Sequence, residues 1–526
     1  MSTPSPASAG SLIRWAGLLA GPLLALLAYF FLPEQYAGIE GKSIAFTAAG
    51  RATLAMMIWM ATWWLTEAVD IEVTALLPLA TFGLFGIASM KAAAAPYADD
   101  TIFLFMGGFL LALSMQRWGL DKRIALITLA AVGTKPASMV AGFMIATGLL
   151  SAFVSNTATA AMMMPIAMSV IALIEHQTQT SAENESPSAS EIHRRDMKHL
   201  SLALLLGIAY SASIAGIATI IGTPPNVILI GFLKDKIEEK YRIDISFYQW
   251  LKIGVPLTLV FLPIVWLVLT KFLFPVKMKS IEGGRELIDR EYRKLGKPNR
   301  GEWITFIVFV CTAILWITRP WLSKLGWGEG DARMLPLKGL SDAGIAMLAG
   351  LVLFVTPVNR SQREFTMNWQ TAVKLPWGIL ILFGGGLSLA AAVQANGVAQ
   401  FIGSQATIFQ GASPIIIVLV IATMVIFLTE LTSNTATTAA LLPVMAALAP
   451  GLGVHPYLLV FPTAIAASCA FMLPVATPPN AIVFASGHVT IPQMCKAGIW
   501  LNIIGVLLVT LLTMIVLGPV LGVELY

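Results

Sequence analysis

The chain has 526 residues, of which 57% are hydrophobic and only 12% are charged, and its mean hydropathy is +0.80. Soluble domains carry about 25% charged residues, so this composition excludes an ordinary soluble fold and indicates a chain that lies mostly in lipid. The net charge of +5 does not indicate a nucleic-acid partner, because the basic residues lie in loops beside apolar segments, where membrane topology explains them.

Apolar segments long enough to cross a membrane recur along the whole chain. Each crossing needs about 20 residues as a helix, and the sequence predicts an all-α polytopic membrane protein with about 11 transmembrane helices. The first four segments are 12–32, 46–65, 73–90 and 102–115, and a basic amphipathic stretch at 116–134 follows them. The first segment is interpreted as a retained helix, because no basic stretch precedes it as in a signal peptide.

Polar residues interrupt the next two apolar runs. The run 136–174 is about twice the length of one crossing and has the tripeptide Ser-Asn-Thr at 155–157, which favours a re-entrant hairpin with a polar tip over one straight helix. The run 210–232 is interrupted by Thr-Pro-Pro-Asn at 223–226. Between the two runs, the polar segment 175–199 predicts a flexible loop.

A strongly basic segment at 277–300 divides the chain near its middle, after a predicted span at 247–274. The positive-inside rule places this basic segment in the cytoplasm. The second half then repeats the first in outline. In chain order, its expected elements are spans at 303–317, 343–358 and 377–393, a hairpin at 414–449 with Ser-Asn-Thr at 433–435, a broken helix at 458–486 with Thr-Pro-Pro-Asn at 477–480, and a last span at 497–521.

The two halves match residue for residue around these motifs. Residues 151–165 align without gaps to 429–443, and residues 223–228 likewise align with 477–482. The tip and the break are 67 residues apart in the first copy and 43 in the second, and the difference of 24 matches the polar segment 175–199. An odd number of spans before the second copy would invert it relative to the first, which is the usual architecture for alternating access.

Interrupted helices inside a bilayer free backbone groups that must find a partner in protein, water or a ligand. Two consecutive prolines in a helix interior cost about 3 kcal/mol or more. A pair that occurs in both copies therefore indicates that the helix breaks serve a function. Carbonyl groups at the end of a half-helix suit a sodium ion, and amides at the start of the next suit a carboxylate. The Ser-Asn-Thr side chains can serve either ion, and two copies suit a substrate with two carboxylates.

At these motifs the sequence resembles the divalent anion:sodium symporter family, whose hallmarks are paired Ser-Asn-Thr tips and paired Thr-Pro-Pro-Asn-like breaks. The resemblance extends from about residue 46 to the end. It implies an inverted-repeat, elevator-type transporter that forms a homodimer. The implied division is 1–135 N-terminal scaffold helices, 136–275 first transport-domain repeat, 276–302 basic cytoplasmic loop, 303–411 second scaffold segment and 412–526 second transport-domain repeat.

The resemblance also implies roles for particular residues. One sodium ion would be held by Ser151, Ser155, Asn156 and the backbone near Gly222, and another by Thr429, Ser433, Asn434 and the backbone near Ala476. The substrate carboxylates would meet Asn156, Thr157, Thr223, Pro224, Asn434, Thr435, Thr477 and Pro478.

The function that we expect is sodium-coupled symport of C4 dicarboxylates (succinate, malate, fumarate) across a bacterial cytoplasmic membrane, with Na⁺ as the co-transported ion and membrane lipid as the surroundings. A sodium-independent exchanger of the same family, a citrate or sulfate symporter and an anion channel remain as alternatives. We do not expect an enzyme, because the chain has no HExxH or GxSxG and no histidine near either tip. Glu430 adjoins the second tip and is interpreted as a proton site, an ion-pair partner or a residue facing a wet cavity.

Overall fold

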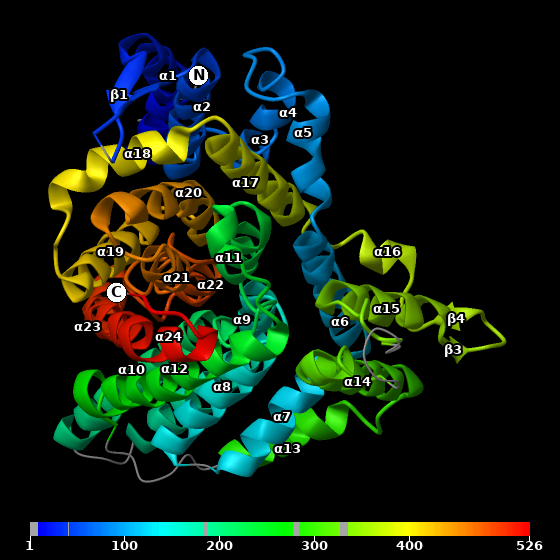
Figure 1. Cartoon of the computed structure of the whole chain (residues 1–526). Helices are drawn as coiled ribbons and strands as arrows, with labels where there is room; N and C mark the ends of the chain where they lie inside the picture. Colours follow the sequence, from blue (N-terminus) through cyan, green and yellow to red (C-terminus); the bar gives the residue numbers. More distant parts are fainter. Residues whose placement is uncertain are drawn as a thin grey trace, which may run out of the picture.

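The structure, a computed structural model, describes residues 9–39, 41–133, 135–182, 187–276, 283–326 and 335–525. Regular structure in these ranges is almost entirely helical (Figure 1). The strands found there form two short antiparallel hairpins, in which β1 (Gln35–Ala37) pairs with β2 (Ser43–Ala45) and β3 (Pro357–Asn359) pairs with β4 (Glu364–Phe365). The predicted all-α fold class is therefore confirmed.

Nine helices within the described residues are long and apolar enough to cross a membrane. They cover Leu12–Phe31, Met90–Trp118, Asn156–Glu175, Arg194–Gly216, Phe247–Leu273, Arg300–Leu322, Trp377–Ala395, Asn434–Leu452 and Ile491–Leu521. The pair Val398–Phe409 and Pro414–Thr429 passes the same test together but bends by 117°. The polytopic helical architecture agrees with the sequence, whereas the number of about 11 spans stays a prediction.

The first motif-bearing repeat comprises five helices. They are α8 (Pro136–Ser151), α9 (Asn156–Ala182), α10 (Pro187–Gly216), α11 (Pro224–Asp235) and α12 (Phe247–Leu267), with the π-helical turn η3 (Val268–Leu273) after α12. Helices α8 and α9 form the predicted hairpin around residues 152–155, and α10 and α11 form the predicted broken helix.

The second repeat has the same order of elements. Its helices are α19 (Pro414–Thr429), α20 (Asn434–Leu452), α21 (Tyr457–Ala466), α22 (Pro478–Ala485) and α23 (Ile491–Leu511), followed by η6 (Leu512–Leu517) and α24 (Gly518–Leu521). The repeats interlock, because α11 packs against α20 and α21 while α22 packs against α9 and α10. Figure 1 shows α11 in green beside the orange helices of the second repeat.

The remaining helices flank the two repeats. They are α1 (Ala9–Phe31), α2 (Ala48–Thr66), α3 (Ile71–Thr74), α4 (Leu77–Thr81), α5 (Met90–Ala94), η1 (Ala95–Ala98), α6 (Asp100–Trp118), α7 (Leu120–Val132), α13 (Gly284–Lys294), α14 (Arg300–Leu322), α15 (Asp342–Val355), α16 (Trp369–Ala372), α17 (Trp377–Ala395) and α18 (Val398–Ala406). Two short 3-10 turns are η2 (Glu239–Tyr241) and η5 (Thr407–Phe409). Helix α7 joins the flanking helices to the first hairpin, and α18 joins them to the second.

The span predicted at 73–90 is wrong as a single helix, because this stretch is divided among α3, α4 and the start of α5. Gly86 adopts φ +65°, a left-handed conformation that glycine tolerates and that cannot continue a helix. Ser89 then caps α5 by accepting a hydrogen bond from the backbone N–H of Ala92.

The flexible loop predicted at 175–199 is also wrong in its described part. Residues 175–182 continue α9 and residues 187–199 begin α10, whereas 183–186 lie outside the described residues. Asp196 is buried, and His199 Nδ1 lies 2.9 Å from the carbonyl oxygen of Pro275. The polar residues of this segment therefore belong to helices that continue past their apolar parts. A helix outside lipid needs no continuous apolar sequence.

The basic segment predicted at 277–300 contains a helix, α13, although residues 277–282 lie outside the described part. A buried ion pair anchors its end to the flanking helices. Arg123 on α7 contacts both carboxylate oxygens of Glu302 on α14 at 3.1 Å and donates to the carbonyl of Gly296 at 3.0 Å. The two side chains are 7% and 5% exposed, so water cannot solvate either charge when its partner is removed.

The Arg123–Glu302 pair predicts an asymmetric mutational response. Glu302→Ala leaves a buried guanidinium without its anion, which costs about 3–5 kcal/mol, whereas replacing both charges with apolar residues of similar volume is often close to neutral. We expect a clear fall in the melting temperature of purified Glu302→Ala and recovery in Arg123→Met/Glu302→Met. Equal melting temperatures for the single variant and the wild type would contradict this role.

Candidate functional site

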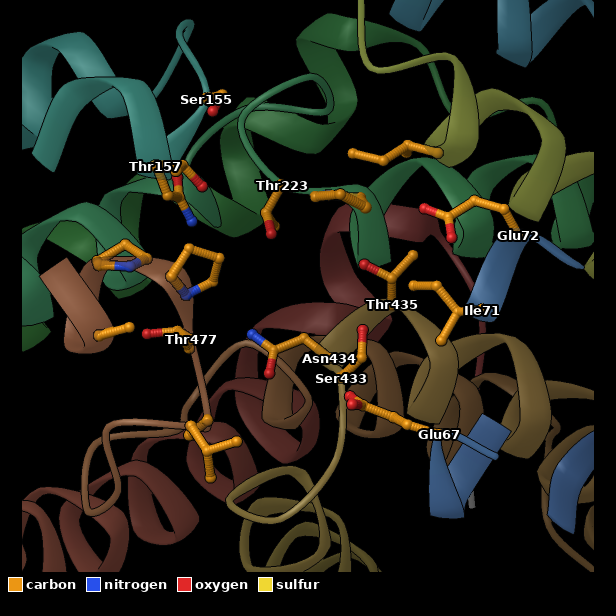
Figure 2. Close-up of a pocket in the computed structure, with 18 of the residues that line it drawn as sticks. Glu67, Ile71, Glu72, Ser155, Thr157, Thr223, Ser433, Asn434, Thr435 and Thr477 are labelled. Carbon is orange, nitrogen blue, oxygen red and sulfur yellow. The ribbon is translucent and has the colours of Figure 1, made fainter. Parts of the chain in front are cut away.

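A cavity of about 750 Å³ lies where the two hairpin tips and the two broken helices meet. It is lined by twelve of the fourteen residues that the sequence singled out, from both repeats. These are Ser155, Asn156, Thr157, Gly222, Thr223, Pro224, Ser433, Asn434, Thr435, Ala476, Thr477 and Pro478. Figure 2 shows Thr157, Thr223, Asn434, Thr435 and Thr477 converging around this space. The remaining two, Ser151 and Thr429, are fully buried and do not line it.

Four helices begin at the cavity wall. Their first residues all line it and are Asn156 of α9, Pro224 of α11, Asn434 of α20 and Pro478 of α22. The first turn of a helix has N–H groups without helical partners and carries the positive end of the helix dipole. Four such ends around one space create a setting that favours an anion.

The paired prolines occupy the first turns of α11 and α22. They do not interrupt a helix interior, as we expected from the sequence, and the expected cost does not arise. A proline in the first turn gives up an N–H that has no helical partner, and its φ already suits a helix. The prolines therefore define where each half-helix starts. Thr477 adds a cap by accepting from the N–H of Asn480 at 3.3 Å, whereas Thr223 makes no such bond.

The asparagine of each tip is anchored in the same way. Ser151 Oγ donates to the carbonyl of Ala212 at 2.9 Å and lies 2.6 Å from one terminal atom of the Asn156 amide. In the second copy, Thr429 Oγ1 donates to the carbonyl of Ala467 at 3.0 Å and lies 2.7 Å from the corresponding atom of the Asn434 amide. Each tip is thus tied to the end of the first half of its own broken helix.

Oxygen atoms crowd the Asn156 amide. One of its terminal atoms lies 2.6 Å from Ser151 Oγ, 3.1 Å from the carbonyl oxygen of Ala212 and 3.3 Å from that of Gly222. As nitrogen, this atom can donate a hydrogen bond to these oxygens. As oxygen, it completes a group of four, and hydroxyl, amide and backbone oxygens are the ligands that hard cations prefer.

Two further asparagines hold the unwound segments, and our list of site residues omitted them. Asn226 Nδ2 donates to the carbonyls of Gly216 (3.1 Å) and Thr219 (2.8 Å). Asn480 Nδ2 likewise donates to Ala470 (3.3 Å) and Leu473 (3.1 Å). The partners lie 10 and 7 residues upstream in both copies. The signal was present as the fourth residue of each Thr-Pro-Pro-Asn motif.

Glycines let a neighbouring helix touch each unwound segment. A Cβ atom at Gly254 of α12 would lie 2.3 Å from the carbonyl oxygen of Ile217, and one at Gly498 of α23 would lie 2.4 Å from that of Phe471. Contacts under 3.0 Å do not occur between real Cβ atoms and backbone, so a larger residue would displace the turn.

Glu430 supports the second unwound segment only. Its carboxylate accepts from the backbone N–H groups of three consecutive residues, Phe471 (2.7 Å), Met472 (2.9 and 3.0 Å) and Leu473 (3.1 Å). Asn502 Nδ2 donates to it at 2.8 Å. The aligned residue of the first copy is Ala152. Glu430 is 3% exposed, does not line the cavity and pairs with no base among the described residues, which contradicts the wet-cavity and ion-pair interpretations.

The cavity wall opposite Thr157 and Thr477 is acidic (Figure 2). We did not predict this wall from the sequence. The ionisable side chains that line the cavity, within the described ranges, are Arg14, Glu67, Asp70 and Glu72. Arg14 lies 3.2 Å from Glu67. Figure 2 shows Glu67 and Glu72 on the side away from Thr157 and Thr477. Glu67, Asp70 and Glu72 lie in the short link between the predicted spans 46–65 and 73–90, so the sequence offered no signal that they reach the cavity.

A stability prediction follows for Glu430. Glu430→Gln replaces one acceptor oxygen by an NH₂ group that faces a backbone N–H, and a buried donor without an acceptor costs about 1–3 kcal/mol. We expect a lower melting temperature than in Glu286→Gln, which removes an exposed carboxylate from α13. Unchanged melting of Glu430→Gln would mean that the carboxylate does not hold the 471–473 turn.

Comparisons with known proteins agree with this architecture. Residues 14–523 match the family model described as the sodium:sulfate symporter transmembrane region. The chain is 40% identical over 509 residues to the sodium-dependent dicarboxylate transporter SdcS of Staphylococcus saprophyticus, covering 97% of this chain and 92% of that protein. It is also 40% identical over 520 residues to SdcS of Staphylococcus aureus strain RF122, covering 99% and 94%.

Solved structures show the same kind of fold at low identity. MtrF of Neisseria gonorrhoeae, from a class of antimetabolite efflux pumps, has a TM-score of 0.56 at 13% identity and covers 98% of this chain and 97% of its own. The YdaH transporter of Alcanivorax borkumensis has a TM-score of 0.53 at 14% identity, covering 96% and 97%. The protein is therefore an integral membrane transporter, not an enzyme, and it belongs to the sodium:sulfate symporter family.

Proposed function

We propose that this transporter is a sodium-coupled symporter of C4 dicarboxylates such as succinate, malate and fumarate in a bacterial cytoplasmic membrane. The observation that carries the proposal is the convergence of both Ser-Asn-Thr tips and both Thr-Pro-Pro breaks on one cavity. The names of the relatives, sodium-dependent dicarboxylate transporters at 40% identity over nearly the whole chain, support both the substrate class and the coupling ion.

The substrate would lie between the two tips. One carboxylate would accept hydrogen bonds from Asn156, Thr157 and the start of α11 at Thr223, and the other from Asn434, Thr435 and the start of α22 at Thr477. Pro224 and Pro478 lie beside these groups and line the same cavity. Neutral donors and helix N-termini bind a carboxylate in this way without a formal positive charge.

Sodium would occupy the oxygen groups behind each tip. The first would comprise Ser151, Ser155, Asn156 and the backbone near Gly222, and the second Thr429, Ser433, Asn434 and the backbone near Ala476. Each tip asparagine would then touch an ion on one side and the substrate on the other. Sodium binding would orient the amide for the carboxylate, which couples the two binding events.

The charges of the cavity favour symport over sodium-independent exchange. Arg14 is the one base among the described cavity-lining residues, and it pairs with Glu67. A dicarboxylate dianion therefore meets no free fixed countercharge there, and moving an uncompensated anion out of water is costly. Sodium ions would supply the missing positive charge.

The proposed movement is of the elevator type. In this proposal the repeats at 136–275 and 412–526 move as transport domain against scaffold helices at 1–135 and 303–411, with the basic segment at 276–302 on the cytoplasmic side. The scaffold would form a homodimer surrounded by membrane lipid. The cavity supports this division, because its tips belong to the repeats, whereas Phe105 and Ile379 belong to flanking helices and Glu67 follows the flanking helix α2.

The coupling is tested with purified protein in proteoliposomes. We expect radiolabelled succinate uptake with an inward sodium gradient and background uptake when choline replaces sodium. Unlabelled malate and fumarate should compete, and citrate and sulfate should compete weakly. Uptake driven only by internal succinate without sodium would identify an exchanger, and stronger competition by sulfate or citrate would replace the C4 assignment.

The tip residues are tested by substitution. A hydrogen bond to a charged group contributes about 1.5–3 kcal/mol, so Asn156→Ala and Asn434→Ala should each lower succinate uptake at low concentration by about 10- to 100-fold. Thr429→Ala should raise the sodium concentration needed for half-maximal uptake, whereas Thr423→Ala, six residues earlier on α19, should not. Near-normal uptake by either asparagine variant with wild-type melting would refute the site.

A further inference from the structure

A second, smaller groove of about 350 Å³ lies between the first turn of α12 and the end of α14, apart from the cavity described above. Three basic side chains line it, namely Lys252, Arg319 and Lys324, together with Tyr248 and Trp321. No acidic side chain of the described residues lines this groove. Its lining is therefore basic and aromatic, with the Arg319 charge shared with Asp342, which lies outside the groove.

The groove lies at the ends of two candidate membrane spans. The chain leaves α12 into the basic segment and enters α14 directly after it, so the start of α12 and the end of α14 share the opposite face of the bundle. Aromatic contacts hold these ends together, since Phe247 stacks on Trp316 at 4.6 Å and Tyr248 packs on Trp321 at 4.8 Å between ring centroids. Aromatic and basic side chains together at span ends are typical of the boundary between lipid and water.

An apolar track leads from the groove along each helix. On α14, exposed side chains recur at helical spacing in Ile314 (54% exposed), Ile317 (38%) and Trp321 (53%). On α12, exposed Lys252 is followed on the same face by Pro256 and by Leu259, which is 67% exposed. A molecule with a charged head in the groove could therefore lay apolar chains along both helices.

The basic residues are held in place for such a head. Lys252 Nζ lies 5.1 Å from the centre of the Tyr248 ring, a cation–π contact. Arg319 Nε lies 2.7 Å from Asp342 Oδ1, and Asp342 Oδ2 accepts from the N–H of Phe247 at 2.8 Å. The Arg319 guanidinium is thus anchored through Nε, and its terminal N–H groups can still donate hydrogen bonds to a phosphate.

We propose that this groove binds the headgroup of an anionic phospholipid, with the phosphate between Lys252, Arg319 and Lys324 and the acyl chains along α12 and α14. Lysine and arginine side chains donate charge-assisted hydrogen bonds to phosphate oxygens, and here they would do so at the membrane face opposite the basic segment. A soluble dianion would use the same charges but not the two apolar tracks, so the tracks favour a lipid as the occupant.

Lipid retention of the purified full-length protein tests this assignment. Dioleoylphosphatidylglycerol is titrated against dioleoylphosphatidylcholine, and bound lipid is counted by native mass spectrometry. Two lysines close to a phosphate predict about 10- to 30-fold weaker phosphatidylglycerol binding in Lys252→Gln/Lys324→Gln, with phosphatidylcholine unchanged. The control is Arg290→Gln/Arg293→Gln, which removes the same charge from exposed positions of α13 and should bind as the wild type does.

A charge-conserving variant separates lost binding from lost structure. Lys252→Arg/Lys324→Arg should keep phosphatidylglycerol binding and should melt like the wild type, because it keeps both positive charges and both positions are exposed. Equal binding by Lys252→Gln/Lys324→Gln and the wild type would overturn the proposal. Displacement of the bound phosphatidylglycerol by millimolar succinate would overturn it too, because it would make the groove a site for soluble anions.

Discussion

Backbone groups freed inside an apolar bundle must be paired, and the structure around the cavity depends on how this requirement is met. Between Gly216 and Thr223, and again between Ala466 and Thr477, the chain is not helical although it is surrounded by buried side chains. Leaving such groups unpaired costs several kcal/mol each in lipid. Asn226 and Asn480 satisfy part of this requirement, because each donates hydrogen bonds to two backbone carbonyls at equivalent positions of its own copy.

The same contacts decide which groups remain for a ligand. Asn226 binds the carbonyls of Gly216 and Thr219, so that the carbonyl of Gly222 remains near the tip asparagine. The N-termini of α11 and α22 face the other way, into the cavity. The proposed sodium site and the proposed carboxylate site are thus adjacent, with the tip asparagine between them. This arrangement is the physical basis of the proposed coupling.

The two copies are not equivalent in charge. The second turn is held by the Glu430 carboxylate and Asn502, whereas the first has Ala152 in the aligned place and Thr219 donating to the carbonyl of Ala152. Glu430 thereby places a buried carboxyl group behind only one of the two proposed sodium sites. The two proposed sites therefore differ electrostatically although their oxygen ligands match, and the acidic wall with Glu67 adds to the asymmetry.

Sequence reasoning located most of the cavity because the motifs are duplicated and short-range, so Asn156 and Asn434 could be recognised without knowing any tertiary contact. It misplaced the role of Pro224 and Pro478, because a sequence does not say whether a proline begins a helix or interrupts one. It missed Glu67 and Glu72, which reach the cavity only through packing of a distant segment. It took 175–199 as a loop because polarity is shared by loops and by helices that leave the membrane.

In the proposed mechanism, sodium binds at both unwound turns and organises them before the substrate arrives. Hydrogen–deuterium exchange of the purified protein in sodium and in choline, without substrate, tests it most directly. Slower exchange in sodium at both 212–223 and 467–477, with unchanged exchange in α13, is the predicted result. Exchange that is insensitive to sodium at both turns, or that slows only after succinate is added, would contradict the account.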